Sequence, residues 1–81
     1  MEPLIGLGEV IEHLRNSPDN CARRRGWNGK HQVIKLQEPG PQSKMTEPYI
    51  HMEFSPFGGA LRRIPWLASQ ADLLAEDWEL G

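Results

Sequence analysis

Residues 49–54 read Tyr-Ile-His-Met-Glu-Phe, and their alternation decides the fold class. Ile50, Met52 and Phe54 recur at every second position, and successive side chains of a β-strand point to opposite faces of a sheet. The stretch therefore predicts a strand with one apolar face. Residues 31–37 alternate in the same way and predict a second strand.

The segments that flank these two strands read as turns and loops. Residues 38–48, between the strands, contain three prolines and one glycine and predict a loop. Residues 55–59 contain one proline and two glycines and predict a turn, after which residues 60–64 predict another strand. Asn28-Gly29, upstream of the first strand, is a strong hairpin signal because both residues accept positive φ at low cost.

The N-terminal stretch follows a helical period. Leu7, Val10 and Leu14 recur at the spacing of one helix face, so the pattern predicts a helix over residues 6–15. Pro18 ends that helix, because a proline disfavours helical geometry in the residue before it.

Near the C-terminus, Ser69 and Asp72 match a capping box and predict a short helix over residues 69–75. Residues 77–80 predict a last short strand. The sum is an α+β fold, in which the N-terminal helix packs on a small antiparallel sheet of four to five strands and a short second helix lies near the C-terminus.

Length and composition are those of one small domain spanning residues 1–81. A domain of this size has a thin stability margin, so oligomerisation is a usual remedy. Cys21 is the one cysteine, which excludes an intrachain disulfide and suits a reducing cytosol. No apolar run approaches the roughly 20 residues that span a bilayer, and the N-terminus does not resemble a signal peptide. We therefore expect a cytoplasmic protein with no membrane association.

Charge is distributed unevenly along the chain. Residues 22–63 hold eight basic and three acidic residues, whereas both flanking stretches are acidic and the whole chain carries −2. Two readings fit this pattern: a local anion site in the middle of the chain, or ordinary surface scatter.

Catalytic and metal patterns are weak. His13, His31 and His51 are scattered, and a zinc site formed by Cys21 with His31 and His51 has none of the recognised spacings. No phosphate-binding P-loop is present in the sequence. We therefore expect no enzyme activity, no catalytic residues, no cofactor and no metal.

Binding is better supported. Trp27 lies inside a Gly-Trp-Asn-Gly turn, where its indole either stacks on a purine or caps the hydrophobic core. Arg25 offers charge for phosphates, and Gly29 allows close backbone approach.

Trp66 precedes the capped helix, whose Ser69, Gln70 and Asp72 are candidates for ribose or base edges. For Trp78 we expect packing in the core.

Three segments occur in order: Arg-Gly-Trp-Asn-Gly-Lys at 25–30, Met-Thr-Glu-Pro-Tyr-Ile at 45–50, and Pro-Trp-Leu-Ala-Ser-Gln-Ala-Asp-Leu-Leu-Ala-Glu-Asp-Trp at 65–78. Together they closely resemble the Thoeris anti-defence type 2 family of phage and prophage proteins, over nearly the whole chain. The last segment is specific, whereas the Gly-Trp-Asn-Gly turn alone is a weak signal.

The resemblance implies a sponge in the cytoplasm of an infected bacterial host cell. Such a protein binds cyclic or glycocyclic ADP-ribose-type messengers, blocking Thoeris immunity without cleaving them, and some members also bind cyclic oligonucleotides of the CBASS system at a separate site. The resemblance further implies a homotetramer with ligand pockets between subunits. Together with the residue patterns, it gives the predicted ligand-binding set Arg25, Trp27, Asn28, Gly29, Trp66, Ser69, Gln70 and Asp72.

This chain departs from the family pattern at residues 55–63, which are longer and more basic than the short turn expected there. The departure leaves the choice of ligand open. Three alternative functions also remain open: a degrading enzyme, a nucleic-acid-binding module, and a structural or assembly protein of a phage.

Overall fold

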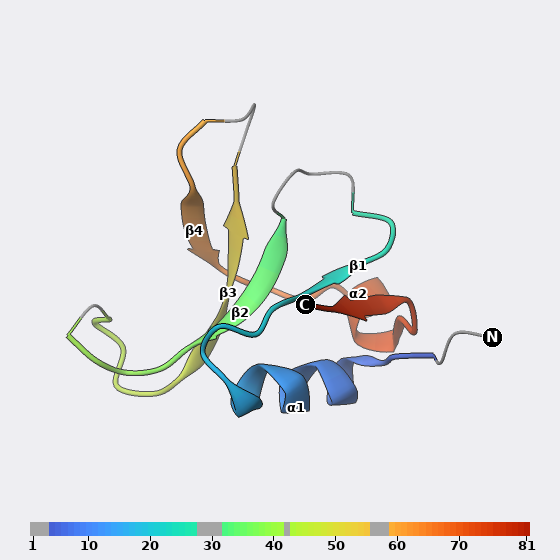
Figure 1. Cartoon of the computed structure of the whole chain (residues 1–81), viewed down its shortest axis with the longest axis horizontal. Coiled ribbons are helices and arrows are strands. Elements are labelled where there is room, and N and C mark those ends of the chain that lie inside the picture. The colour runs from blue at the N-terminus through green and yellow to red at the C-terminus, as the bar shows by residue number, and fades with distance from the viewer. Residues whose placement is uncertain (1–3, 28–31, 42, 56–58) are drawn as a thin grey trace.

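The computed structural model describes residues 4–27, 32–41, 43–55 and 59–81. Within these ranges the elements are α1 (Leu7–Asn16), β1 (Ala22–Arg24), β2 (Val33–Gln37), β3 (Tyr49–Phe54), β4 (Arg62–Pro65), α2 (Gln70–Leu74) and β5 (Trp78–Leu80). The described strands form one antiparallel sheet in the order β4-β3-β2-β1-β5. Figure 1 shows α1 along one side of this sheet and α2 next to β5. The α+β fold is as predicted.

The hydrophobic core lies where α1 packs on the sheet. Val10 and Leu14 are one helical turn apart on α1, and both are buried against Ala22, Ile34 and Trp78. Residues four apart lie on the same side of a helix, so the apolar spacing of α1 directs both side chains into the core. Each such side chain contributes about 1.5–3 kcal/mol by leaving water. The core therefore anchors α1 to β1, β2 and β5.

The sheet has one apolar face and one polar face. In the β2–β3 pair, Ile34 lies opposite Met52 and belongs to the face that packs on α1, which we term the core face. Lys35 lies opposite His51, one residue further along, so both belong to the other face. We term this second face, which carries Lys35, His51, Glu53 and Arg63, the outer face.

The connection from β4 to β5 takes the chain from one edge strand of the sheet to the other. It contains α2, which begins as the capping box predicts. The Asp72 backbone N–H donates to the Ser69 hydroxyl oxygen at 3.1 Å, and the Ser69 N–H donates to the Asp72 carboxylate at 3.0 Å. The same connection brings Trp66, which follows β4, beside Trp78 on β5.

Most predicted elements are present, with ends shifted by one or two residues. The exception is β1, which was not predicted because Ala22-Arg23-Arg24 shows no apolar alternation. These residues form a strand because β5 pairs with all three and β2 pairs with Ala22. The hairpin turn predicted at Asn28-Gly29 lies outside the described residues. No helix in the described part of the chain is long and apolar enough to cross a membrane.

Candidate functional site

Three tryptophans from distant parts of the chain form one cluster. Trp78 of β5 is 2% exposed and lies at its centre. The ring of Trp27 is 5.4 Å from that of Trp78 at an interplanar angle of 78°, and the ring of Trp66 is 5.9 Å away at 87°. Both contacts are edge-to-face, a geometry that contributes about 0.5–1.5 kcal/mol per pair beyond burial. We term Trp27, Trp66 and Trp78 the tryptophan cluster.

Backbone hydrogen bonds hold the two outer indoles in place. The Trp27 N–H donates to the Arg24 carbonyl oxygen at 3.1 Å, which closes a turn directly after β1. The Trp66 N–H donates to the Ile50 carbonyl oxygen at 3.0 Å, which continues the β3–β4 ladder by one residue. Trp27 and Trp66 remain half-buried, unlike Trp78 at the centre of the cluster. Trp78 was correctly expected to pack in the core.

The centre of the cluster holds a polar atom without a partner. The Trp78 indole nitrogen is buried, and no described residue accepts its hydrogen. A buried donor left unpaired costs about 1–3 kcal/mol. The unpaired donor therefore belongs to the same ring that both Trp27 and Trp66 contact.

Beside the tryptophan cluster, Arg24 forms hydrogen bonds with two acidic residues, Asp77 and Asp72. Its Nε donates to Asp77 at 3.0 Å, and its Nη1 donates to Asp72 at 3.1 Å. The hydrogen bond to Asp77 raises the pKa of Arg24 the most, and the hydrogen bond to Asp72 raises it further. Burial opposes the charge of Asp72, but hydrogen bonds from the Ser69 backbone and from Arg24 outweigh it and lower the pKa of Asp72. Both partners are therefore charged at neutral pH.

Two of the three predicted site residues at the start of α2 form its capping box. Ser69 and Asp72 satisfy each other's backbone N–H groups, and Asp72 also accepts from Arg24. Gln70 is exposed at the first helical position. The structure thus brings Ser69, Gln70 and Asp72 into the segment that follows Trp66, with two of the three side chains already engaged.

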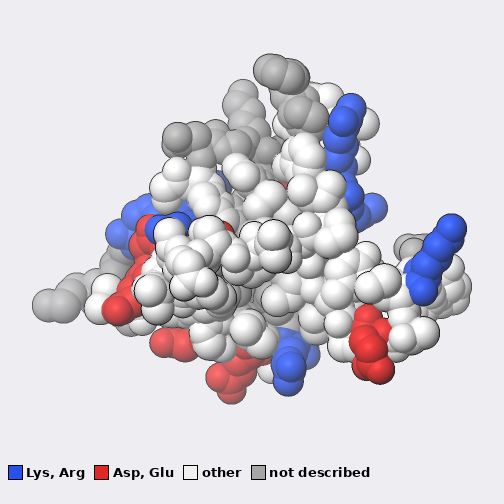
Figure 2. Space-filling view, turned by 180° about the vertical axis from the view of Figure 1, so that it is seen from behind, with Lys and Arg blue, Asp and Glu red and all other residues white. Residues whose placement is uncertain are grey.

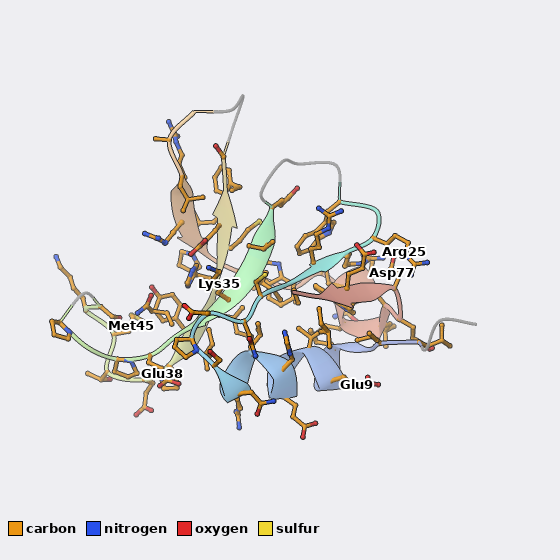
Figure 3. All side chains as sticks on the ribbon, in the orientation of Figure 1. Glu9, Arg25, Lys35, Glu38, Met45 and Asp77 are labelled. Atoms are coloured by element: carbon orange, nitrogen blue, oxygen red, sulfur yellow. The ribbon has the colours of Figure 1, made fainter. Side chains whose placement is uncertain are left out.

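The other predicted site residues lie beyond the end of β1. The Arg25 N–H donates to the Asp77 carbonyl oxygen at 3.1 Å, so Arg25 and Asp77 lie side by side (Figure 3). The exposed Arg25 guanidinium is 3.8 Å from the Glu79 carboxylate. Asn28 and Gly29 lie outside the described residues.

The basic stretch of β1 is largely matched by acids of the C-terminal region. Arg23 is 3.4 Å from Glu79 because β5 runs antiparallel beside β1. Arg24 contacts Asp77, which precedes β5, and Asp72 of α2. In the rear view of Figure 2, charged residues of both signs lie around the edge, and the middle is mostly uncharged. On this face the described residues form no continuous basic surface of the kind typical of nucleic-acid-binding proteins.

A buried polar cluster on the outer face was not predicted. The Glu53 carboxylate is 3.0 Å from His51 Nε2, 3.0 Å from Arg63 Nε and 3.7 Å from Lys35 Nζ. His51 and Glu53 are only 5% and 8% exposed. Burial raises the pKa of Glu53, but hydrogen bonds from His51 and Arg63 and the charge of Lys35 outweigh it and lower that pKa. His51 Nδ1 is buried with no partner among the described residues.

A separate apolar groove lies between α1 and the ends of β2 and β3. Its volume is about 590 Å³, and its lining residues are Ile11, Leu14, Arg15, Leu36, Glu38, Pro48, Tyr49 and Ile50. None of the three tryptophans lines it. Across the described residues, no group of three or more His, Cys, Asp or Glu side chains is arranged to hold a metal ion. His31, which belonged to the considered zinc set, lies outside them.

Comparison with known protein families places the chain. A family model described as the Thoeris anti-defense 2-like domain matches residues 5–81. The matched range includes all seven described elements and the whole tryptophan cluster. No curated protein matches the chain.

Proposed function

Because the chain belongs to the Thoeris anti-defense 2-like family, we propose that it binds and sequesters a small nucleotide messenger without cleaving it. The family gives the protein a role in Thoeris anti-defence. The proposed ligands are cyclic or glycocyclic ADP-ribose-type signals, held in the cytoplasm of an infected bacterial cell. The observation that carries the proposal is that Trp27 and Trp66 both make edge-to-face contacts with Trp78 while remaining only half-buried.

Each outer indole provides a surface on which a purine stacks, which is worth about 1–3 kcal/mol per base. The Arg25 guanidinium is the proposed partner of the pyrophosphate. A charge-assisted hydrogen bond of this kind adds about 1.5–3 kcal/mol. Neither contribution depends on a nucleophile or a base, so binding alone is enough to deny the messenger to its effector.

Submicromolar binding corresponds to more than about 8 kcal/mol, and one stacked base with one charged contact falls short of it. We therefore propose that a second subunit closes the pocket, within a homotetramer. Leu67 lies two residues before the N-cap of α2 and is 93% exposed, and Leu74 is the last residue of α2 and is 78% exposed. We propose that these exposed leucines contribute to the contact with the second subunit. Binding of cyclic oligonucleotides at a separate site belongs to the same proposal.

The test is to mix the purified protein with one equivalent of glycocyclic ADP-ribose, remove free messenger by filtration, and heat the complex. Mass spectrometry of the supernatant is expected to recover the messenger with its mass unchanged. A hydrolysed product would instead indicate an enzyme, and His51 with Glu53 at 3.0 Å is then the pair to substitute first. Retention of no messenger at all would contradict the proposal.

Salt separates this proposal from nucleic-acid binding. Contacts with many phosphates give a steep loss of affinity as salt rises, whereas a pocket for one small ligand gives a shallow one. A phage assembly role would be indicated if Trp27→Ala dissociated the oligomer and left messenger binding unchanged.

A further inference from the structure

Arg24 occupies the one place in the described structure where the supports of all three tryptophans meet. It lies opposite Trp78 in the β1–β5 register, and its carbonyl oxygen accepts the N–H of Trp27. Its guanidinium contacts Asp77, which precedes Trp78, and Asp72, which caps the helix that follows Trp66. Arg24 therefore connects the turn after β1 through its backbone carbonyl, and the starts of β5 and α2 through its side chain.

These three supports belong to different parts of the chain. The turn that carries Trp27 is closed by one backbone hydrogen bond, and α2 has no buried residue of its own. The half-buried guanidinium of Arg24 satisfies two carboxylates that would otherwise repel each other. Its charge-assisted hydrogen bonds are stronger than neutral ones, and their geometry is directional.

We propose that Arg24 is a positioning residue of the nucleotide-binding site, which sets the spacing between Trp27 and Trp66 on either side of Trp78. This inference rests on the proposed function, because spacing matters only if the two indoles hold a ligand. Arg24 acts through the two carboxylates and not by touching the ligand. It thereby differs from Arg25, whose guanidinium is exposed beyond the strand end.

The role requires arginine and not merely a positive charge. Nε and Nη1 of the planar guanidinium contact Asp77 and Asp72 at 3.0 and 3.1 Å at the same time. A lysine ammonium is a compact point charge at the end of a flexible stem, and it does not reproduce this fixed fork. Arg24→Lys is therefore expected to lose much of the effect of Arg24.

Arg23 provides a matched control. It is the neighbouring arginine of the same strand and contacts Glu79 at 3.4 Å, but its side chain belongs to the outer face. Arg23→Met removes the same charge and an ion pair without changing the support of any tryptophan. Any difference between Arg24→Met and Arg23→Met thus reports the position of Arg24.

The experiment measures two properties of the wild-type protein and of the Arg24→Met, Arg24→Lys and Arg23→Met variants. Calorimetric titration with glycocyclic ADP-ribose gives Kd. Circular dichroism of the ligand-free protein reports the exciton coupling between the perpendicular indoles. We expect Arg24→Met to bind the messenger about tenfold more weakly, which is within the range for residues coupled in one hydrogen-bond network. We also expect this variant to lose most of the exciton signal. Arg24→Lys is expected to lie between it and the wild type, and Arg23→Met to match the wild type.

The two readouts separate this inference from the proposed function. If the wild type binds no nucleotide, the proposed function fails, whereas an exciton signal lost only in the Arg24 variants still supports positioning. If Arg24→Met keeps wild-type Kd and signal while Trp27→Ala loses binding, the positioning role is wrong and the function stands. Should Arg24→Met fail to fold, Asp77→Ala removes one of the two contacts, and an unchanged Kd and exciton signal in that variant would overturn the inference.

Discussion

Replacing Trp27 by alanine separates the structural contribution of this side chain from its proposed contribution to binding. Trp27 is half-buried and makes one edge-to-face contact, with Trp78 at 5.4 Å. Losing that contact costs about 0.5–1.5 kcal/mol, and the partial re-exposure of Trp78 adds a similar amount. We therefore expect the free energy of unfolding to fall by about 1–3 kcal/mol. In a domain of this size, each kcal/mol lowers Tm by about 4–8 °C.

The effect on messenger binding is expected to be separate and additional. Removing one stacking surface is worth about 1–3 kcal/mol, so Kd for glycocyclic ADP-ribose should rise roughly 5- to 150-fold. Calorimetry at a temperature where both proteins are folded measures Kd, and a thermal melt without ligand measures stability. Tyr49→Ala is the control, since Tyr49 is another half-buried aromatic residue outside the tryptophan cluster. Equal Kd values for Trp27→Ala and the wild type would refute the assignment of Trp27 to the site.

Three further predictions concern stability. The folded-state pKa of Glu53 lies below its ordinary value of 4.5, so Glu53 stabilises the fold above that pH and the contribution is lost as pH falls through the lower, folded value. Acid titration of unfolding should therefore show a shallower decline for Glu53→Gln than for the wild type, and identical acid limbs would contradict the prediction. Leu14→Ala removes a fully buried side chain from the core and should cost about 2–5 kcal/mol in urea unfolding, whereas a cost below about 1 kcal/mol would mean that α1 is not anchored as described. Ser69→Ala removes the acceptor of the Asp72 N–H and should cost about 0.5–2 kcal/mol, with Ser69→Asp as the restoring variant.

The elements that could be predicted are those whose signal is local. The alternation of residues 49–54 matches β3 from end to end, because a strand with one apolar face shows the period of the sheet in its own sequence. The capping box of Ser69 and Asp72 was predictable for the same reason, since both partners lie within one helical turn.

The features that were missed depend on pairing between distant segments. β1 contains two arginines in three residues, and it is a strand because β5 and β2 pair with it. The register with β5 also brings Arg24 to Asp77. That register also gives Arg24 a role different from that of Arg23 and Arg25, a distinction that the run of three arginines hides. Trp27 and Trp66 were singled out individually, but their common contact with Trp78 follows from the crossover between the two edges of the sheet.

The buried outer-face cluster was missed for a further reason. Alternation on β3 assigns His51 and Glu53 to the polar face, which sequence reasoning treats as exposed to water. Their spacing of two residues places both on one face of the strand, and this was the available signal that they interact. The cations that cover Glu53 come from β2 and β4, and the order of those strands was not readable from the sequence.

The central proposal is that the tryptophan cluster binds a nucleotide messenger without cleaving it. The most direct measurement is an indole ¹H–¹⁵N NMR spectrum of the protein, assigned by single substitution and recorded during titration with glycocyclic ADP-ribose. The expected result is that the Trp27 and Trp66 signals move and saturate at a fixed stoichiometry, while the ³¹P spectrum of the bound messenger stays constant for hours. Indole signals that do not move at saturating messenger, or ³¹P signals of a cleaved product, would contradict the claim.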